Sequence, residues 1–483
     1  MEVFSGILDR PSRPARASAL LRGRASYAVA VPVRVVHRTA IDYLSGMERS
    51  TSSARVTRDS GGPTTEDVVV IGAGAAGLMA ARELTRAGKR VVVLEGGRRT
   101  GGRVLTLFET RAGIPIELGA EFVHGDAPVT TRLLDEARLA TVPVSGEHVR
   151  SDDGQLSPQG PIWARMARVF ALMSKRRKTD RSFQAFLDRR PGGARLARDR
   201  ELADAFVQGF EGADPALISE RSLAEQGNPT EGAATARRVV NGYAALIVHL
   251  EREVASFVRL RTTARRIEWS DAGVRVIDAN GTVHSARAVV IAVPLTILQD
   301  DALHIDPEIP ALRHAANRLV MGHVARVCVV VRERFWEGKT HELSFVHAPR
   351  RPFTVWWTQH PIQAPLLVGW AGGPAALALT RGGAVEDVAR SELGHVFRMR
   401  RARAESVVES IHWHDWSNDP LVRGAYSYIG VGGMAAPRTL ARSVGGRVFI
   451  AGEASDAESG GTVEAALASG ERAARAVLRA LAV

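Results

Sequence analysis

The stretch of sequence that decides the fold is VVVIGAGAAG, residues 68–77. Its first four residues are a continuous apolar run, which is typical of a parallel strand buried on both faces. Gly72, Gly74 and Gly77 follow in the spacing G-x-G-x-x-G and lead into a helical stretch. A second apolar run at residues 90–94 completes a β-α-β opening. The chain is therefore expected to begin its fold with a dinucleotide-binding unit.

Each position of this loop needs glycine for a different physical reason. The first makes a tight turn, the second lets the backbone approach a pyrophosphate, and the third lets helix and strand pack closely. Ala76 lies in the first helical turn, where unpaired N–H groups and the positive end of the helix dipole face a phosphate. Glu95 ends the second strand, where a carboxylate accepts hydrogen bonds from ribose hydroxyls. These features predict a dinucleotide cofactor but do not by themselves separate NAD from FAD.

Three later stretches carry related chemistry. In EGGRRTGGR, residues 95–103, a glycine pair beside arginine would wrap a diphosphate while a guanidinium pairs with it. In ELGAEFVHG, residues 117–125, the small residues would let the backbone lie against a flat ring. In FIAGE, residues 449–453, a strand ends in a carboxylate, and GGTVE at 460–464 starts a second glycine-led helix. The dipole of that helix could stabilise negative charge on a reduced flavin.

These four stretches together resemble the flavin-containing amine oxidase family, which includes monoamine oxidases, polyamine oxidases and lysine-specific histone demethylases. The resemblance covers residues 66–480 and points to a bacterial member. It implies an α/β chain with a two-domain FAD-binding fold of Rossmann type (glutathione-reductase-like) and an interleaved α+β substrate domain with a mixed sheet. Four shorter matches agree with it: NGY at 241–243, VPL at 293–295, FW at 335–336 and GAYSY at 424–428.

The resemblance and the apolar pattern together predict a discontinuous organisation. We expect the FAD-binding domain to comprise residues 66–127, 236–300 and 440–483, and the substrate domain residues 128–235 and 301–439. Residues 1–65 are interpreted as a disordered or mis-called extension, with a targeting segment as the alternative. Periodicity predicts mostly helix over 128–256, further helices at 384–397 and 462–481, and strands at 257–260, 264–269, 274–278, 288–293, 319–331, 343–347, 354–358, 366–371, 405–413, 424–428 and 447–451.

The resemblance assigns cofactor contacts residue by residue. The loop glycines would face the pyrophosphate, Glu95 the adenosine ribose, and Arg103 the phosphates, while Ala264 would lie on the adenine side. Glu453 would bind the ribityl chain, and the N–H of Val463 would face the pyrimidine end of the flavin. The full expected set is Gly72, Gly74, Ala76, Gly77, Glu95, Arg99, Gly102, Arg103, Gly119, Ala120, Glu121, Phe122, Ala264, Gly452, Glu453, Thr462 and Val463.

Four residues are candidates for the catalytic region. His124 would lie near the amine, and Tyr426 and Thr462 would form opposite walls of the cage around it. Arg326 stands where the family has the Lys that holds a water at flavin N5, and it is bulkier and always protonated. Three of them have simpler interpretations. His124 could be a loop histidine with its hydrogen bonds made within the chain, Tyr426 a packed strand residue, and Arg326 a structural arginine.

Two positions bear on how the flavin is held. Position 425 is Ala, where monoamine oxidases carry the Cys that links to the flavin. Cys328 lies in a strand that is expected to be core. The resemblance therefore implies FAD that is not covalently bound, and no metal site is expected.

The leading functional hypothesis is an FAD-dependent amine oxidase. Hydride transfer from the carbon next to a neutral amine to flavin N5 would give an imine, and oxygen would reoxidise the flavin to give hydrogen peroxide. Two alternatives remain open. One is an FAD dehydrogenase or desaturase that acts on an isoprenoid, porphyrin-like or amino-acid substrate with another acceptor, and the other is a non-catalytic FAD-bound protein.

Composition limits the remaining possibilities. Of 483 residues, 45% are hydrophobic and 24% charged, as in an ordinary folded protein. The net charge is +12, but the sequence has no basic patch with interleaved aromatic residues, so nucleic-acid binding is not expected. No apolar run reaches a membrane span, and one cysteine permits no internal disulfide. We expect a cytoplasmic monomer or homodimer whose partners are a small amine and oxygen.

Overall fold

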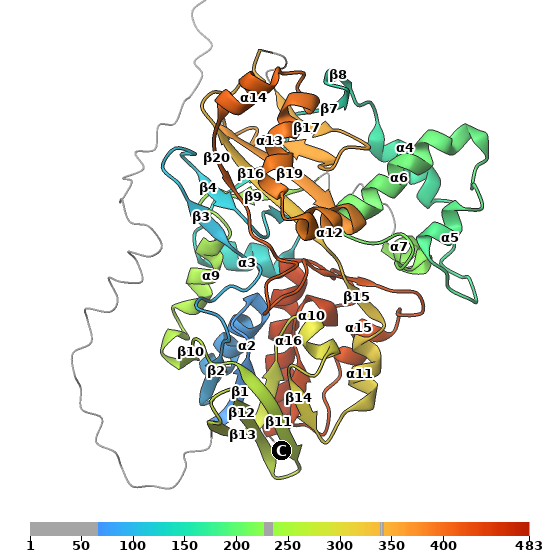
Figure 1. Ribbon diagram of the computed structural model, residues 1–483. Helices are drawn as coiled ribbons and strands as arrows, with labels where there is room; N and C mark the ends of the chain where they lie inside the picture. The colour runs from blue at the N-terminus through green and yellow to red at the C-terminus, as the bar shows by residue number, and fades with distance from the viewer. Residues whose placement is uncertain (1–65, 227–234, 339, 341, 483) are drawn as a thin grey trace, which may run out of the picture. The chain divides into compact units, whose positions relative to one another are not determined.

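The structure is a computed structural model, and it describes residues 66–226, 235–338, 340 and 342–482. The predicted N-terminal extension, residues 1–65, lies outside the described residues. Two large β-sheets, each covered by helices, organise the described chain (Figure 1). Among the described helices, none is both long and apolar enough to cross a membrane.

The first sheet is built around the strand that the sequence singled out, β1 (Glu66–Ile71). It pairs in parallel with β2 (Val91–Leu94) on one side and β13 (Val283–Ile291) on the other. The sheet is mixed, because an antiparallel hairpin continues it beyond β13. Its other strands are β10 (Val258–Arg259), β12 (Gly273–Asp278), β11 (Ala264–Ser270), β14 (His304–Asp306) and β22 (Val448–Ile450), the last pairing with β13.

Helices cover both faces of this sheet. Val68 and Val70 of β1 lie in a core with helices α2 (Ala75–Arg86) and α16 (Val463–Leu481). Val69 and Ile71 point to a second core, which contains residues of α11 (Pro310–Ala316) and α15 (Ala436–Leu440). Alternate residues of one strand thus enter two cores, which explains why its sequence is apolar without interruption.

The second sheet is also mixed. Its strand order is β20 (Val408–His412), β16 (Val324–Val331), β19 (Leu366–Gly372), β18 (Val355–Trp357), β17 (Leu343–His347), β7 (Glu147–Asp152) and β8 (Gln155–Pro158). Apolar residues of β16 on one face pack with α13 (Val385–Val396) and α14 (Arg401–Val407). The other face of β16 carries Arg326 and Cys328, and the cysteine is fully buried, as the sequence predicted.

A helical cluster follows β8 in the chain. Helices α4 (Ile162–Phe170), α5 (Phe183–Leu187), α6 (Ala197–Phe210) and α7 (Glu220–Gln226) share a core rich in phenylalanine. The remaining elements are β3 (Thr106–Phe108), β4 (Pro115–Glu117), β5 (Phe122–Val123), α3 (Pro128–Glu136), β6 (Thr141–Pro143), η1 (Ala194–Leu196), β9 (Arg237–Val239), α9 (Ala244–Glu251), η2 (Ala255–Phe257), α10 (Leu295–Gln299), β15 (Leu319–Met321), α12 (Gly373–Gly382), β21 (Ser427–Ile429) and η3 (Glu453–Ser455).

Two expectations about local structure were wrong, and one helix was missed. The expected helical region contains strands β6 to β9, because short polar strands such as EHVRSD show little apolar periodicity. The expected strand at 405–413 begins as α14, and α12 was missed because its glycine-proline start reads as a turn. In addition, β14 pairs with β11 of the first sheet, although the sequence grouped residues 301–306 with the substrate segments. The discontinuous two-domain division remains our proposal.

Candidate active site

One cavity of about 1500 Å³ dominates the described part of the chain. Pockets for drug-sized ligands usually measure about 300–1,000 Å³, so this cavity can hold a dinucleotide together with a second molecule. Its wall contains nineteen of the twenty residues singled out from the sequence. The exception is Gly77, which packs behind the loop.

The glycine loop divides into two kinds of position. A Cβ on Gly72 would lie 2.7 Å from the carbonyl oxygen of Ala292, and one on Gly77 would lie 1.8 Å from the oxygen of Gly72. These two glycines are therefore required by the protein's own packing. A Cβ on Gly74 would meet only Gly102 Cα, at 4.0 Å, so the chain leaves open space there. That open space lies beside the first turn of α2, which has no side-chain cap and no acidic residue.

The charged residues near this loop already have partners within the chain. The two carboxylate oxygens of Glu95 accept hydrogen bonds from the N–H groups of Ala73 at 2.7 Å and Gly97 at 2.6 Å. Arg99 donates to the carbonyls of Thr100, Gly102 and Val104, so its guanidinium fixes the 101–102 turn. Burial lowers the pKa of Arg99.

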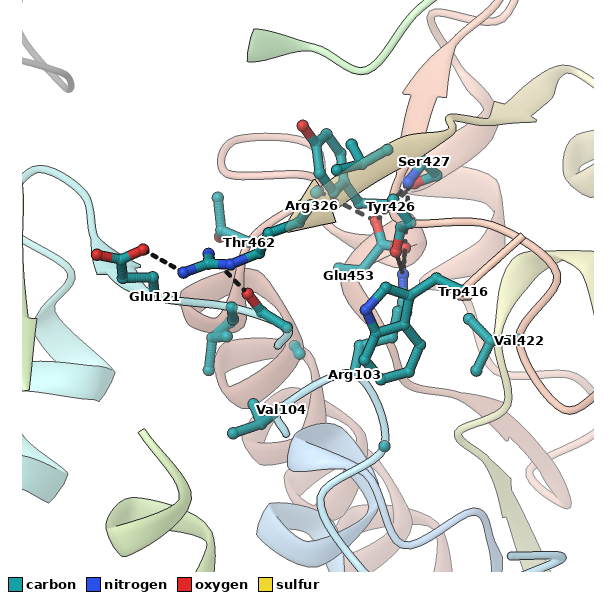
Figure 2. A pocket seen from close by; sticks show the side chains of 18 of the residues that line it. Arg103, Val104, Glu121, Arg326, Trp416, Val422, Tyr426, Ser427, Glu453 and Thr462 are labelled. Carbon is teal, nitrogen blue, oxygen red and sulfur yellow. Dashed lines mark hydrogen bonds and ion pairs between the residues drawn. The ribbon is translucent and has the colours of Figure 1, made fainter. Parts of the chain in front are cut away.

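Glu453 joins three segments that are distant in the sequence. Its carboxylate accepts hydrogen bonds from Arg103 at 2.8 Å, from the hydroxyl of Ser427 at 2.6 Å and from the N–H of Gly461 at 3.1 Å. Figure 2 shows Arg103 and Ser427 converging on this carboxylate. Thr462 caps α16, because its hydroxyl oxygen accepts from the N–H of Ala465. The buried carboxylate thus holds the 452–463 turn against the loop that ends at Arg103.

Arg326 is anchored by a second buried carboxylate. Its guanidinium pairs with Glu121 and donates to the carbonyl of Gly119 at 3.3 Å (Figure 2). Glu121 also accepts from Arg238 at 2.6 Å and from the indole of Trp357. The Nε of Arg326 is buried and has no hydrogen-bond partner among the described residues. Arg326 thus lines the cavity while its Nε, which the chain covers, stays an unused donor.

These contacts fix the charges of both groups. Burial alone would lower the pKa of Arg326, but the adjacent Glu121 carboxylate raises it above its ordinary value. Burial alone would raise the pKa of Glu121, but Arg326 and Arg238 lower it. Both groups are therefore ionised at neutral pH.

Aromatic side chains continue the cavity beyond Arg326. Trp357 lies under the guanidinium at 5.4 Å and contacts Phe122 at 5.8 Å between ring centroids. His124 packs edge-on against Phe210 at 5.6 Å. Tyr426 donates its hydroxyl to the carbonyl of Phe210 at 2.7 Å, and burial raises the pKa of this phenol. The expected cage wall Tyr426 is therefore held by helix α6.

Glu211, directly after α6, is a cavity residue that the sequence analysis missed. Among the carboxylates that line the cavity, it is the one that makes neither an ion pair nor a hydrogen bond with a backbone N–H of the described residues. Burial raises its pKa to about 7, and the side chain of Gln226 partly opposes this. No motif surrounds it, so only its place in the folded chain reveals it.

A flavin fits the residues present. The open space at Gly74, the unfilled N-terminus of α2 and the small Gly119 and Ala120 leave room for a diphosphate and a flat ring. A Cβ on Gly119 would lie 2.0 Å from the carbonyl oxygen of Arg103, so this backbone is locked beside the cavity.

Comparison with known proteins agrees with this geometry. The family model for flavin containing amine oxidoreductases matches residues 75–478. A lysine-specific histone demethylase 1 homolog 2 from Oryza sativa is 28% identical over 86% of this chain and 57% of its own length. Human lysine-specific histone demethylase 2 is 25% identical over 85% of this chain and 53% of its own. The chain thus spans about half the length of these relatives.

Solved structures share the fold. A putrescine oxidase structure superposes with a TM-score of 0.73 at 22% identity, covering 86% of this chain and 99% of that one. Cyclohexylamine oxidase from Brevibacterium oxydans gives 0.73 at 21% identity, covering 87% and 100%. These structures confirm the predicted two-domain FAD-binding fold. The family model confirms the flavin cofactor and the oxidoreductase class. The chain belongs to the flavin-containing amine oxidoreductase family.

Proposed function

We propose that the protein is an amine oxidase that acts on a small primary or secondary amine. The observation that carries this proposal is one continuous cavity in the described chain that runs from the glycine loop to an aromatic chamber containing Glu211. The bound cofactor would supply the redox chemistry: the carbon next to a neutral amine loses a hydride to flavin N5, leaving an imine, and oxygen takes the electrons as hydrogen peroxide.

The aromatic chamber prepares the amine for this chemistry. An amine in water is mostly protonated, and a protonated amine cannot give up the hydride. Burial among Phe122, Trp357 and Tyr426 disfavours charge and so lowers the pKa of a bound amine. Glu211 is placed to meet the incoming ammonium and to take up its proton, since the pKa of this carboxyl is about 7.

Arg326 is the residue that separates an oxidase from a dehydrogenase. It stands where the family has lysine, and Glu121 and the carbonyl of Gly119 hold its guanidinium in place. Its Nε has no partner among the described residues and is covered by the chain, so a small movement of the side chain would bring it to a water or to the cofactor. We propose that this donor replaces the lysine function in the reaction with oxygen. A dehydrogenase that uses another acceptor is the second candidate, and the substitution at this position favours it.

The same cavity wall supports FAD that is held without a covalent bond. Ala425 lines the cavity, and Cys328 is buried with its thiol donating to the carbonyl of Glu117 at 3.2 Å. Acid precipitation of the protein should release all of the yellow cofactor into the supernatant. A lone buried cysteine also suits a reducing compartment, which supports our proposal of a cytoplasmic protein.

The decisive experiment is anaerobic stopped-flow spectroscopy of the purified yellow protein. Monoamines, polyamines and amino acids are mixed with it singly, and oxygen is then added. We expect one amine class to bleach the flavin and oxygen to restore the colour rapidly with release of peroxide.

Slow recolouring with oxygen, together with rapid recolouring by an artificial acceptor, would identify the dehydrogenase. Failure of every amine to bleach the flavin would refute amine oxidation and leave the desaturase or non-catalytic alternatives.

A further inference from the structure

The end of the cavity away from the glycine loop is also polar, and it is formed by two strands of the second sheet. In β7, His148 and Arg150 lie on the same face, because strand residues alternate. In the neighbouring parallel strand β17, Phe345 pairs in register with His148, and His347 pairs with Arg150. All four line the cavity, while the intervening valines enter the core behind. The sheet therefore presents a polar row to the cavity.

The two histidines form a direct pair. Nδ1 of His148 lies 3.1 Å from Nε2 of His347, and the rings are stacked with centroids 5.4 Å apart. His148 also stacks on Phe345 at 4.7 Å, and Phe345 contacts Trp357 at 6.1 Å. Because Trp357 lies under Arg326, a chain of ring contacts connects the proposed reaction centre to this pair.

The pair is uncharged at neutral pH. Burial lowers the pKa of His347 to about 3, with further lowering by His148 and Arg150. Burial also lowers the pKa of His148. Whichever ring donates the shared proton, one outer nitrogen carries a hydrogen and the other does not. The pair therefore offers one hydrogen-bond donor and one acceptor.

Gln159 adds an unused group beside the pair. Its backbone N–H donates to the carbonyl of His148 at 3.1 Å, which fixes it next to β7. The side chain is 7% exposed and lines the cavity, and its oxygen has no hydrogen-bond partner among the described residues. A buried acceptor without a partner costs about 1–3 kcal/mol. Because the chain covers this oxygen, a ligand that donates to it would remove that cost once the side chain rotates towards the cavity.

The charges at this end do not suit a second cation. Arg150 brings a positive charge, which Asp152 partly balances through a 2.7 Å ion pair. Among the described cavity-lining residues, the acids are Glu95, Glu121, Glu211, Asp419 and Glu453, and none belongs to β7, β8 or β17. A buried ammonium needs an anionic partner, whereas a hydroxyl or an amide needs only a donor and an acceptor.

We propose that His148, His347 and Gln159 form a subsite that binds an uncharged hydrogen-bonding group, a hydroxyl or an amide, at the far end of the amine substrate. This inference rests on the proposed function and specifies the substrate class: an amine with a neutral polar tail, not an α,ω-diamine. The subsite contributes to specificity and does not touch the reacting carbon.

The test measures binding apart from oxidation. Amines without a hydrogen on the carbon next to nitrogen bind but cannot be oxidised, so they can be titrated calorimetrically into the FAD-loaded protein. Three series of increasing chain length carry a methyl, a hydroxyl or a second amine at the far end. At the length that reaches the subsite, we expect the hydroxyl compound to bind about five- to tenfold tighter than the methyl compound. The diamine should bind no tighter than the methyl compound.

Two substitutions keep side-chain size while removing the polar atoms. H148F preserves the stack on Phe345, and Q159M preserves side-chain length. Each should reduce the hydroxyl advantage to less than about twofold and leave the affinity for the methyl compound unchanged. Q363M is the matched control, because Gln363 is exposed and does not line the cavity. It should keep the full advantage.

The outcomes separate this inference from the proposed function. Bleaching of the flavin by oxidisable alkylamines with no hydroxyl preference at any length would overturn the subsite alone. Tightest binding of the diamine, or a full hydroxyl preference in both H148F and Q159M, would do the same. Failure of every oxidisable amine to bleach the flavin would overturn the proposed function and this inference with it.

Discussion

The two ends of the cavity are built in different ways. The proposed cofactor end consists largely of backbone: Gly72, Gly74, Gly101, Gly102 and Gly119, and the N-termini of α2 and α16. The proposed substrate end consists of side chains from helix α6 and from strands of the second sheet. A cofactor of fixed shape can be held by backbone geometry, whereas a particular substrate has to be distinguished by individual side chains. Substitutions at the two ends should therefore fail in different ways.

The largest effect is expected at Gly77, and it would test the backbone character of the cofactor end. In G77A the new Cβ would lie 1.8 Å from the carbonyl oxygen of Gly72, so strand and helix must separate. We expect a loss of more than about 3 kcal/mol in the free energy of unfolding, measured by chemical denaturation of the cofactor-free protein.

Gly74 provides the matched comparison. G74A places its Cβ 4.0 Å from the nearest atom of the chain, with an ordinary φ of −74°. The cofactor-free protein should keep its stability, but its flavin content should fall. Equal destabilisation by both substitutions would show that Gly74 serves packing and not the cofactor.

The next effect concerns Glu121, where the two ends meet. E121Q leaves Arg326 and Arg238 buried without their anion, which should cost about 3 kcal/mol at pH 7. The pKa of Glu121 lies below its ordinary value of 4.5, so its stabilisation is present above that pH and is lost as the pH falls through the lowered pKa. The difference in the free energy of unfolding between wild type and E121Q should therefore shrink as the pH falls below 4.5.

Glu117, four residues earlier, should show the opposite pH dependence. Burial raises its pKa to about 7, so ionisation lowers the stability of the wild type as the pH rises from 4.5 through 7. If E117Q is less stable than the wild type, the difference in the free energy of unfolding should therefore shrink as the pH rises. Denaturation curves from about pH 3 to pH 9 would show both trends, and parallel behaviour of the two variants would contradict these assignments.

A smaller effect is expected at Glu211, where it would define the substrate end. E211Q should raise KM for cationic amines about tenfold, because a charged hydrogen bond is lost, while flavin content stays unchanged. In the wild type, KM should improve as the pH rises through 7 and the carboxylate ionises, and E211Q should lack this step. Steady-state kinetics from pH 6 to 8 would measure both quantities, and unchanged KM would remove Glu211 from the site.

The smallest effect is expected at Tyr426. Y426F removes the hydroxyl that donates to Phe210 but keeps the ring in the cage. Stability should fall by about 1 kcal/mol, and the rate of flavin reduction by no more than a few-fold. Y428F is the control, because the hydroxyl of Tyr428 accepts from the N–H of Asp214 away from the cavity. A large drop in rate for Y426F alone would mean that the hydroxyl itself acts in the reaction.

Prediction from sequence succeeded where neighbours along the chain decide the structure. The strand, the glycine turn and the helix of residues 66–86 follow from apolar pattern and local sterics. The helix at 463–481 was expected from its periodicity. The region 128–256 was harder, because β7 contains one apolar residue and is a strand only through its pairing with β17 and β8.

The sequence by itself determined the FAD-binding motifs, since the positive φ of Gly72 and the carbonyl oxygen of Gly72 beneath Gly77 are requirements set within a few residues of chain. Only the tertiary structure paired Arg326 with Glu121, 205 residues away, and His148 with His347, 199 residues away. It also left Glu211 without a cationic partner among the described residues. Charge pairing and burial depend on which distant segments meet, and no spacing along the chain encodes that.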